Sequence, residues 1–221
     1  MVWWKIILVV SAFVFVLIAI IVNVWIRLKI KKIKQKYINQ DQEKTYLDLQ
    51  KLRNDLGQLP FAAKEWIKNK YKPYDIEAVI NTIYTNQFKS ILIIDQSDWF
   101  LSATVSAKSK QKIYFLENQL NIEKLNELQK KFINDYSEIN LQPYQDQNLD
   151  FLVVFKNEIP LVENFQRYYK NLTDNSMMMI LIEDYSNKEL KNFVKFLKTN
   201  NIIYEISYVE SKFLYIAKKS N

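Results

Sequence analysis

The sequence Ile202-Ile-Tyr-Glu-Ile-Ser-Tyr-Val209 is followed by Glu210-Ser211 and then by Lys212-Phe-Leu-Tyr-Ile-Ala217. Both outer runs are rich in β-branched and aromatic residues, which favour strands. Only two residues separate the runs, and a parallel connection would need a dozen or more. The sequence therefore predicts an antiparallel β-hairpin.

Upstream of this hairpin, short apolar runs alternate with segments of helical periodicity. The run at 91–94 is wholly apolar, as in a strand buried on both faces of a parallel sheet. Further strands are predicted at 112–116, 151–155 and 177–182. Helices are predicted at 61–70, 75–87, 97–108, 122–132 and 162–171 and, after a Ser-x-x-Glu capping box, from 186 to 197. The alternation predicts an α/β fold with a mostly parallel sheet that ends in the antiparallel hairpin.

The first 26 residues contain a long apolar segment. Residues 6–22 are apolar except for one serine, and tryptophans lie at both ends of the segment (Trp3, Trp4 and Trp25). Indole rings favour the headgroup region, and the length suffices to cross a bilayer as a helix. We therefore predict a transmembrane anchor over 1–26. A cleaved signal peptide is the alternative, but the charge follows the apolar run and no small-x-small cleavage site is present.

A basic cluster follows the apolar segment directly. It consists of Arg27, Lys29, Lys31, Lys32, Lys34 and Lys36. Because such clusters are retained on the cytoplasmic side, the sequence predicts a single-pass cell-membrane protein with its C-terminal domain in the cytoplasm. We expect the same six residues to contact anionic lipid headgroups. Residues 37–221 are formally neutral, so the net charge of +7 comes from this flank, and no nucleic-acid partner is expected.

A polar segment joins the predicted anchor to the globular part of the chain. Three leucines share one helical face in its second half, and Gly57 followed by Pro60 is a usual helix stop. We expect a basic juxtamembrane helical stalk over 27–57 and an α/β domain over 58–221. The leucine repeat is too short to decide whether the stalk is a coiled coil.

Composition restricts the chemistry. The chain has no cysteine and no histidine, so thiolate chemistry, disulfides and imidazole bases are excluded. Carboxylates, lysine, tyrosine, hydroxyls or a cofactor must carry any reaction. Gly57 is the one glycine in 221 residues, although loops that cradle phosphates or nucleotides ordinarily use several.

From about residue 74 to 218, the order of elements resembles the class I S-adenosylmethionine-dependent methyltransferases. Their Rossmann-like sheet ends in an antiparallel strand inserted beside strand 5. Ile91-Leu-Ile-Ile-Asp95 resembles their strand 1, and Lys112-Ile-Tyr-Phe-Leu-Glu117 resembles strand 2 with its terminal acidic residue. Asp150–Phe155 and Met177–Asp184 resemble strands 4 and 5. In outline the chain is similar to the membrane-anchored methyltransferases of small-genome, AT-rich bacteria.

The resemblance implies S-adenosylmethionine as the cofactor and four cofactor-binding residues. Asp95 would hold the amino end of the ligand and Glu117 the ribose hydroxyls, while Ser97 and Asp98 lie in the loop between the two strands. Capping of the following helix is the alternative role for Ser97 and Asp98. No catalytic residue is assigned, although Lys156 would be a candidate if it were buried.

The sequence departs from the family pattern in two places. Ser97, Trp99 and Leu101 stand where the family has glycines, and the indole of Trp99 either fills the methionine pocket or packs into the core. After strand 4, Lys156 and Asn157 stand where oxygen-directed members place a metal-binding aspartate. Without that ligand, no metal is expected.

Two functions follow from these observations. The first is a membrane-anchored S-adenosylmethionine-dependent methyltransferase that faces the cytoplasm and acts on an unidentified substrate. The alternative is a catalytically inactive methyltransferase-like scaffold, or a module that binds a protein partner at the membrane. A NAD(P)-binding oxidoreductase is a third reading, which the terminal hairpin does not favour.

Overall fold

The computed structural model describes residues 3, 18, 20–29, 47–95, 99–117, 121–156 and 158–219. The chain divides into two units, residues 1–51 and 52–221. In the first unit, residues 20–29 and 47–51 are helical. No helix within the described ranges is both long and apolar enough to cross a bilayer. Most of the predicted anchor, including 4–17, and the segment 30–46 of the predicted stalk lie outside the described residues.

The helix that was predicted to continue to residue 56 ends at residue 52. The next residue, Arg53, is only 4% exposed. Its guanidinium donates hydrogen bonds to Glu77 Oε2 (2.8 Å) and Asp55 Oδ1 (2.7 Å). The backbone N–H of Gly57 donates to the other oxygen of Glu77 at 3.1 Å. The helix ends earlier than predicted because the buried ion pair and the Gly57 hydrogen bond hold residues 53–57 against Glu77, which helical continuation would prevent.

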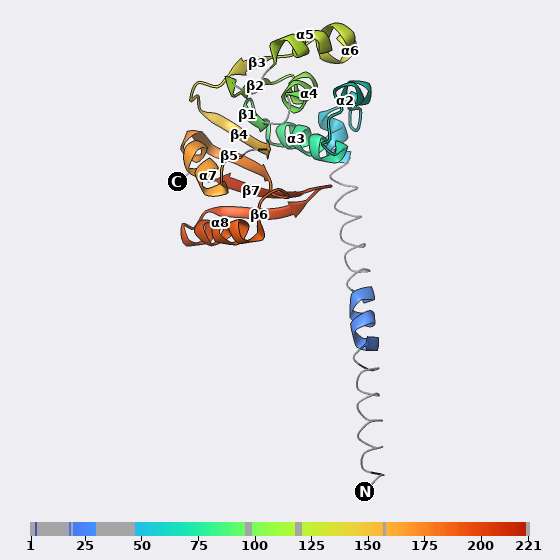
Figure 1. Cartoon of the computed structure of the whole chain (residues 1–221), viewed down its shortest axis with the longest axis vertical. Coiled ribbons are helices and arrows are strands. Elements are labelled where there is room, and N and C mark those ends of the chain that lie inside the picture. Colours follow the sequence, from blue (N-terminus) through green and yellow to red (C-terminus); the bar gives the residue numbers. More distant parts are fainter. Residues whose placement is uncertain are drawn as a thin grey trace. The chain divides into compact units, whose positions relative to one another are not determined.

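The described strands of the second unit form one seven-stranded sheet in the order β3-β2-β1-β4-β5-β7-β6 (Figure 1). The strands are β1 (Ser90–Asp95), β2 (Lys112–Phe115), β3 (Leu141–Pro143), β4 (Leu149–Lys156), β5 (Leu172–Leu181), β6 (Ile203–Tyr208) and β7 (Lys212–Lys218). Strands β1 to β5 pair in parallel, while β7 is antiparallel to both β5 and β6. The mostly parallel sheet with an antiparallel C-terminal hairpin is therefore confirmed.

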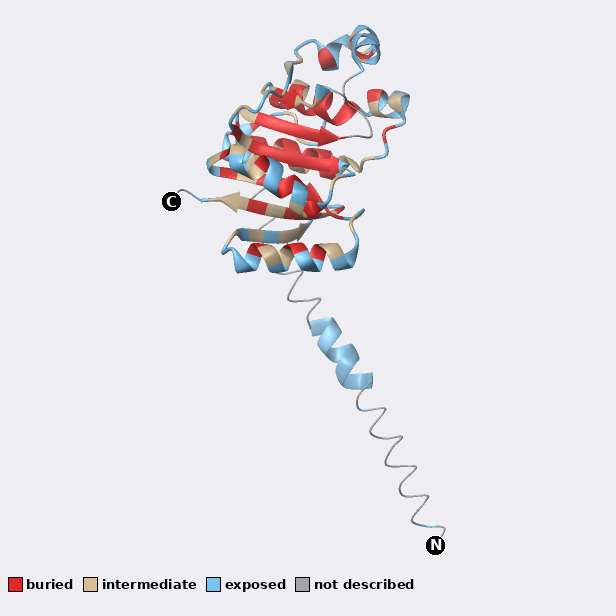
Figure 2. Ribbon diagram, turned by 60° about the vertical axis from the view of Figure 1, so that its left-hand side comes forward, coloured by how far each residue is buried: buried red, intermediate tan, exposed pale blue. Residues whose placement is uncertain are grey.

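Helices cover both faces of the sheet, and the central strands between them are buried (Figure 2). The helices are α2 (Phe61–Ile67), α3 (Pro73–Asn86), α4 (Phe100–Ser109), α5 (Ile122–Lys131), α6 (Ile133–Tyr136), α7 (Leu161–Tyr168) with the 3₁₀ helix η2 (Tyr169–Asn171), and α8 (Asn187–Thr199). One core cluster joins residues of α2, α3, α4, α5 and α6 to the first face, and a second joins α7 and α8 to the other.

The continuous apolar run of β1 follows from this layering. Ile91 and Ile93 belong to the first core cluster, while Leu92 and Ile94 belong to the second. All four side chains are fully buried. Because successive side chains of a strand point to opposite faces, a strand covered on both sides needs apolar residues throughout. Each such side chain contributes about 1.5–3 kcal/mol of transfer free energy.

The helical predictions differ in how well they locate the buried face. In α3, the predicted inner residues Ile76, Val79, Ile80 and Ile83 are all buried. In α5, only Leu128 of the predicted row is buried, and Ile122 is 65% exposed. The periodicity of α5 therefore overstates its contact with the core.

Only one of the two hydrogen bonds of the predicted capping box before α8 forms. The Ser186 side chain accepts a hydrogen bond from the Glu189 backbone N–H at 3.2 Å, as expected of a helix N-cap. The Glu189 carboxylate, however, accepts from the backbone N–H of Leu161 at 2.8 Å. It therefore satisfies the first turn of α7 and ties α7 to α8.

Strand β3 was not predicted. It has only three residues, lies at the sheet edge and has no buried side chain. Neither an apolar run nor alternation marks it, and Pro143 is tolerated because an edge strand need not donate every hydrogen bond.

Candidate functional site

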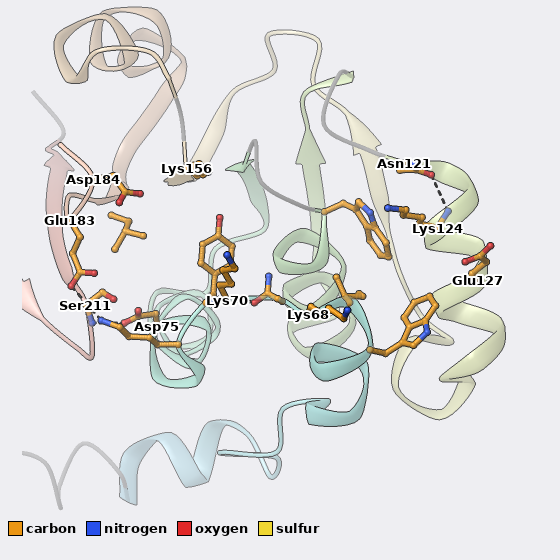
Figure 3. Close-up of a pocket in the computed structure, with 17 residues that line it drawn as sticks. Lys68, Lys70, Asp75, Asn121, Lys124, Glu127, Lys156, Glu183, Asp184 and Ser211 are labelled. Atoms are coloured by element: carbon orange, nitrogen blue, oxygen red, sulfur yellow. Dashed lines mark hydrogen bonds and ion pairs between the residues drawn. The ribbon is translucent and has the colours of Figure 1, made fainter.

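A cavity of about 900 Å³ lies at the carboxyl ends of the parallel strands (Figure 3). One wall is the segment 66–72, which runs from the end of α2 towards α3. Trp99, just before α4, and the first half of α5 form a second wall. The remaining walls are Lys156 at the end of β4, residues 181–184 after β5, and Ser211 in the β6–β7 turn. A volume of this size is typical of sites for small molecules and cofactors.

The structure places two of the four predicted cofactor residues and does not bring them together around this cavity. Asp95 ends β1 and is 2% exposed. Glu117 lies two residues beyond β2 and is exposed. Among the described residues, neither belongs to the cavity lining. Ser97 and Asp98 lie outside the described residues, so their predicted roles remain predictions.

The buried Asp95 receives a hydrogen bond that the sequence did not suggest. The Tyr71 hydroxyl donates to Asp95 Oδ1 at 2.5 Å. The Tyr71 ring packs edge-on against Phe155 at the end of β4, with ring centroids 4.9 Å apart. Tyr71 therefore stands between the cavity and the acidic end of β1. The local sequence around Tyr71 does not predict this contact, because the contact joins residues that are 24 positions apart in the chain.

Trp99 takes the packing role that was one of its two alternatives. It is 6% exposed and belongs to the first core cluster, together with Phe100 and Leu101. Its remaining surface lines the cavity. A glycine at this position would leave open space. The indole fills that space and forms a rigid aromatic wall.

Two of the cavity's carboxylates are engaged by the fold itself. Asp75 is 2% exposed and accepts hydrogen bonds from the backbone N–H groups of Glu210 (3.2 Å) and Ser211 (2.9 Å). Glu183 accepts from the backbone N–H of Lys212 at 3.3 Å and lies 3.5 Å from the Lys72 ammonium. These contacts hold the β6–β7 turn against α3 and the end of β5.

Lys156 is exposed, not buried. A catalytic role was considered only if Lys156 were buried, so that condition is not met. Lys156 nevertheless lies on the cavity wall. In the part of the chain that the structure describes, no three acidic side chains converge as a metal site would require.

Several solved structures with a similar arrangement of elements are methyltransferases. A Staphylococcus aureus protein assigned as a caffeoyl-CoA O-methyltransferase aligns over 80% of this chain and 99% of its own, with 10% identity and a TM-score of 0.55. A methyltransferase from Geobacter sulfurreducens aligns over 81% and 97%, with 13% identity and a TM-score of 0.55. An SAH-bound methyltransferase from Podospora anserina aligns over 82% and 96%, with 13% identity and a TM-score of 0.54. This chain therefore has the class I methyltransferase fold.

Comparison of the sequence alone gives no such match. No protein-family model and no curated protein sequence matches the chain. The likeness is one of architecture, and function has to be argued from the site.

The cavity can be tested against S-adenosylmethionine on its own chemistry. Its volume suits a ligand of this size, and the small part of Trp99 that stays exposed lies on its wall. Lysines and carboxylates on its walls can pair with the charged amino-acid end of the ligand. The described residues therefore fit such a ligand in size and polarity, and the assignment of Asp95 and Glu117 as its partners stays a prediction.

Proposed function

We propose that this protein is an S-adenosylmethionine-dependent methyltransferase attached to the cell membrane by its N-terminal segment, with the α/β domain in the cytoplasm. The observation that carries the proposal is the cavity at the carboxyl ends of β4 and β5, walled by Trp99 before α4, in a sheet of methyltransferase order. Ligands of open α/β sheets bind at this edge. The apolar segment 6–22 and the basic cluster after it support the membrane attachment.

The bound cofactor supplies an electrophilic methyl group, and the protein's tasks in such a displacement are alignment and exclusion of water. Trp99 is fixed by its core contacts and provides a rigid wall. The segment 66–72 forms the wall nearest to α2. Tyr71 keeps the Asp95 carboxylate from water through its hydroxyl. None of these tasks requires a histidine or a metal ion.

Thermal unfolding of the full chain in mild detergent, with and without S-adenosylmethionine, tests the proposal. A ligand at 100 times its dissociation constant stabilises the folded state by about 2.7 kcal/mol. For a domain of this size, that corresponds to a rise in Tm of roughly 5–10 °C. The absence of a shift at millimolar ligand would refute S-adenosylmethionine binding.

The ribose assignment is tested by Glu117→Ala. The side chain is exposed, so the variant should fold normally and lose most of the ligand-induced shift. Glu163→Ala, an equally exposed acidic residue on α7, is the matched control and should keep the full shift. If both variants retain the shift, Glu117 does not contact the ligand.

One set of contacts favours the non-catalytic scaffold as a second candidate. Asp95 is buried and hydrogen-bonded to Tyr71, and Glu117 lies apart from the cavity lining among the described residues. A scaffold that binds a protein partner does not need Asp95 or Glu117 to be available to a cofactor. An unchanged Tm with S-adenosylmethionine, together with normal folding, would favour this function.

A further inference from the structure

The two outermost strands of the sheet differ in how well they are protected from pairing. An edge strand presents backbone N–H and C=O groups to which another strand can add, and short length, proline or lysine discourages such addition. Strand β3 has three residues and ends in Pro143. Strand β6, at the opposite edge, has six residues and neither lysine nor proline (Figure 1). It pairs with β7 along its whole length without a bulge, and no other described strand pairs with it.

Apolar surface remains exposed on both faces of β6. Three large apolar side chains of the strand and of the residue directly after it are exposed; they are Ile203, Tyr208 and Val209. Tyr204 and Ile206 are partly buried against the second core cluster, which includes residues of α8. Because side chains alternate along a strand, the even-numbered residues share this face and the odd-numbered residues lie on the other. Glu205 is the one charged residue of β6.

We propose that β6 pairs in antiparallel fashion with β6 of a second copy of this chain, so that the two seven-stranded sheets become continuous. Two-fold dimers are the commonest oligomers, and they bring the same surface of both copies together. A two-fold axis perpendicular to the sheet keeps each face of β6 on the same side in both copies. Odd-numbered residues therefore oppose odd-numbered residues, and even-numbered residues oppose even-numbered ones.

Charge selects among the registers that this symmetry allows. An axis through Glu205 would bring the two Glu205 carboxylates directly opposite each other, which is destabilising. An axis through Ile206 instead places Glu205 opposite Ser207 of the second copy, whose hydroxyl can donate a hydrogen bond to the carboxylate. The same register pairs Tyr204 with Tyr208, and aromatic cross-strand pairs stabilise antiparallel strands. The axis through Ile206 is therefore favoured.

This register also covers the exposed apolar side chains. Ile203 comes to lie opposite Val209 of the second copy, and the symmetry repeats each pair on the other side of the axis. An axis through Ser207 would instead oppose Glu205 to Val209 and leave Ile203 outside the paired segment. The strand thus supplies both halves of each favourable pair, which identifies a second copy as the occupant.

The dimer goes beyond the proposed function and does not depend on it. None of the six residues of β6 lines the cavity at the carboxyl ends of β4 and β5. The pairing can therefore be tested without S-adenosylmethionine, and a failure of cofactor binding would leave it unaffected.

Single-cysteine variants of the full chain, purified in mild detergent, test the register. The chain has no cysteine, so an introduced thiol reports without background. Ile206→Cys lies on the proposed axis, where directly opposed residues have Cα atoms about 4.5–5.5 Å apart. A disulfide requires a Cα separation of about 4.4–6.8 Å. The linked dimer is followed on non-reducing gels during gentle oxidation.

Two matched controls accompany this variant. In the proposed register, the two copies of Ser207→Cys are diagonal neighbours about 7–8 Å apart, which is outside the disulfide range. Gln142→Cys is exposed on β3 and reports random collisions at the other edge of the sheet. We expect Ile206→Cys to link roughly tenfold faster than either control, because only its two sulfur atoms lie within bonding distance.

Two results would overturn the proposal. Equal rates at the three positions, or a chain that stays monomeric and unlinked with Ile206→Cys, would mean that β6 faces solvent or a different protein. Faster linking of Ser207→Cys would place the axis at Ser207 and refute the proposed register.

Charge variants provide a second measurement, by sedimentation velocity in the same detergent. Ser207→Glu brings carboxylates opposite each other at two symmetric places and should raise the dimer Kd about three- to thirtyfold. Adding Glu205→Lys turns each repulsion into an opposite-charge pair and should restore the dimer, which a general loss of structure would not allow. Gln142→Glu should leave the Kd unchanged, and circular dichroism checks that all variants fold. An association through another part of the chain would not respond to these charges, so an unchanged Kd in Ser207→Glu would contradict the proposal.

Discussion

Six described residues other than glycine adopt left-handed backbone conformations. They are Lys68, Gln87, Lys110, Asp146, Asn175 and Asn201. Three of them follow the last turn of a helix, where glycine is the usual residue. A residue with a Cβ atom is strained there by about 1–2 kcal/mol. The shortage of glycine noted in the sequence is therefore met by accepting backbone strain at helix ends.

This strain predicts opposite effects of two substitutions. Gln87→Gly should stabilise the protein by about 0.5–1 kcal/mol, because relief of strain exceeds the added freedom of the unfolded chain. Gly57→Ala should destabilise it by about 1 kcal/mol, because φ there is +72° although no neighbouring atom lies within 4 Å of the added Cβ. Urea unfolding measures both.

Asn86→Gly is the matched control for Gln87→Gly, since Asn86 is the last helical residue of α3, directly before Gln87. Glycine in that right-handed position should destabilise the helix by several tenths of a kcal/mol. Equal effects of the two glycine variants would show that the left-handed backbone at Gln87 stores no strain.

Among helices and strands, the sequence correctly predicted those that carry a strong apolar periodicity. The β1 run, the α3 face and the terminal hairpin each carry a repeated apolar pattern, and all three formed as expected. Strand β3 carries no such pattern, and the exposed Ile122 shows that a helical apolar row need not be buried. Local patterns cannot report how much of a helix its neighbours cover.

The candidate site was less predictable because its contacts join distant residues. Asp95 and Glu117 were identified from their positions at strand ends, which local sequence reveals. The Tyr71 hydrogen bond to Asp95 and the gathering of lysines around the cavity depend on how the segment 66–72 crosses the sheet edge. The alternation of lysines at 68, 70 and 72 was the one local signal for that surface.

Packing between α4 and α6 predicts sensitivity to alkaline pH. The fully buried Tyr136 hydroxyl lies 2.9 Å from the Thr104 hydroxyl, and burial raises its pKa well above the ordinary value of 10. Burial also raises the pKa of Tyr215 to about 12. A tyrosine with a raised pKa favours the folded state below pH 10, and this stability is lost as pH rises through the folded-state value.

We therefore expect the free energy of unfolding to fall between pH 10 and 12, with absorbance at 295 nm reporting tyrosine ionisation together with loss of circular dichroism. Tyr136→Phe should be less stable at pH 8, because the Thr104 hydroxyl loses its partner, and should lose less additional stability on going to high pH. An identical pH profile in the variant would mean that Tyr136 does not contribute to the transition.

For the whole molecule, the proposed membrane attachment predicts a definite orientation. Because the six basic residues from Arg27 to Lys36 favour the cytoplasmic side, a protease added outside intact cells should leave the domain that contains residues 52–221 uncut. The same protease should digest the domain after the cells are permeabilised, as detected with an antibody to the domain. Cleavage in intact cells would show that the orientation is reversed.

The insertion of β7 between β5 and β6 has a consequence for synthesis on the ribosome. The edge of β5 opposite β4 can be paired only after residues 212–218 have been made. Until then, β5 and its run of three methionines present unsatisfied backbone groups, and Asp75 lacks partners that lie 135 and 136 positions away. A nascent chain in this state exposes a sheet edge prone to self-association. Its yield should therefore depend on chaperones that shield this edge until the hairpin closes.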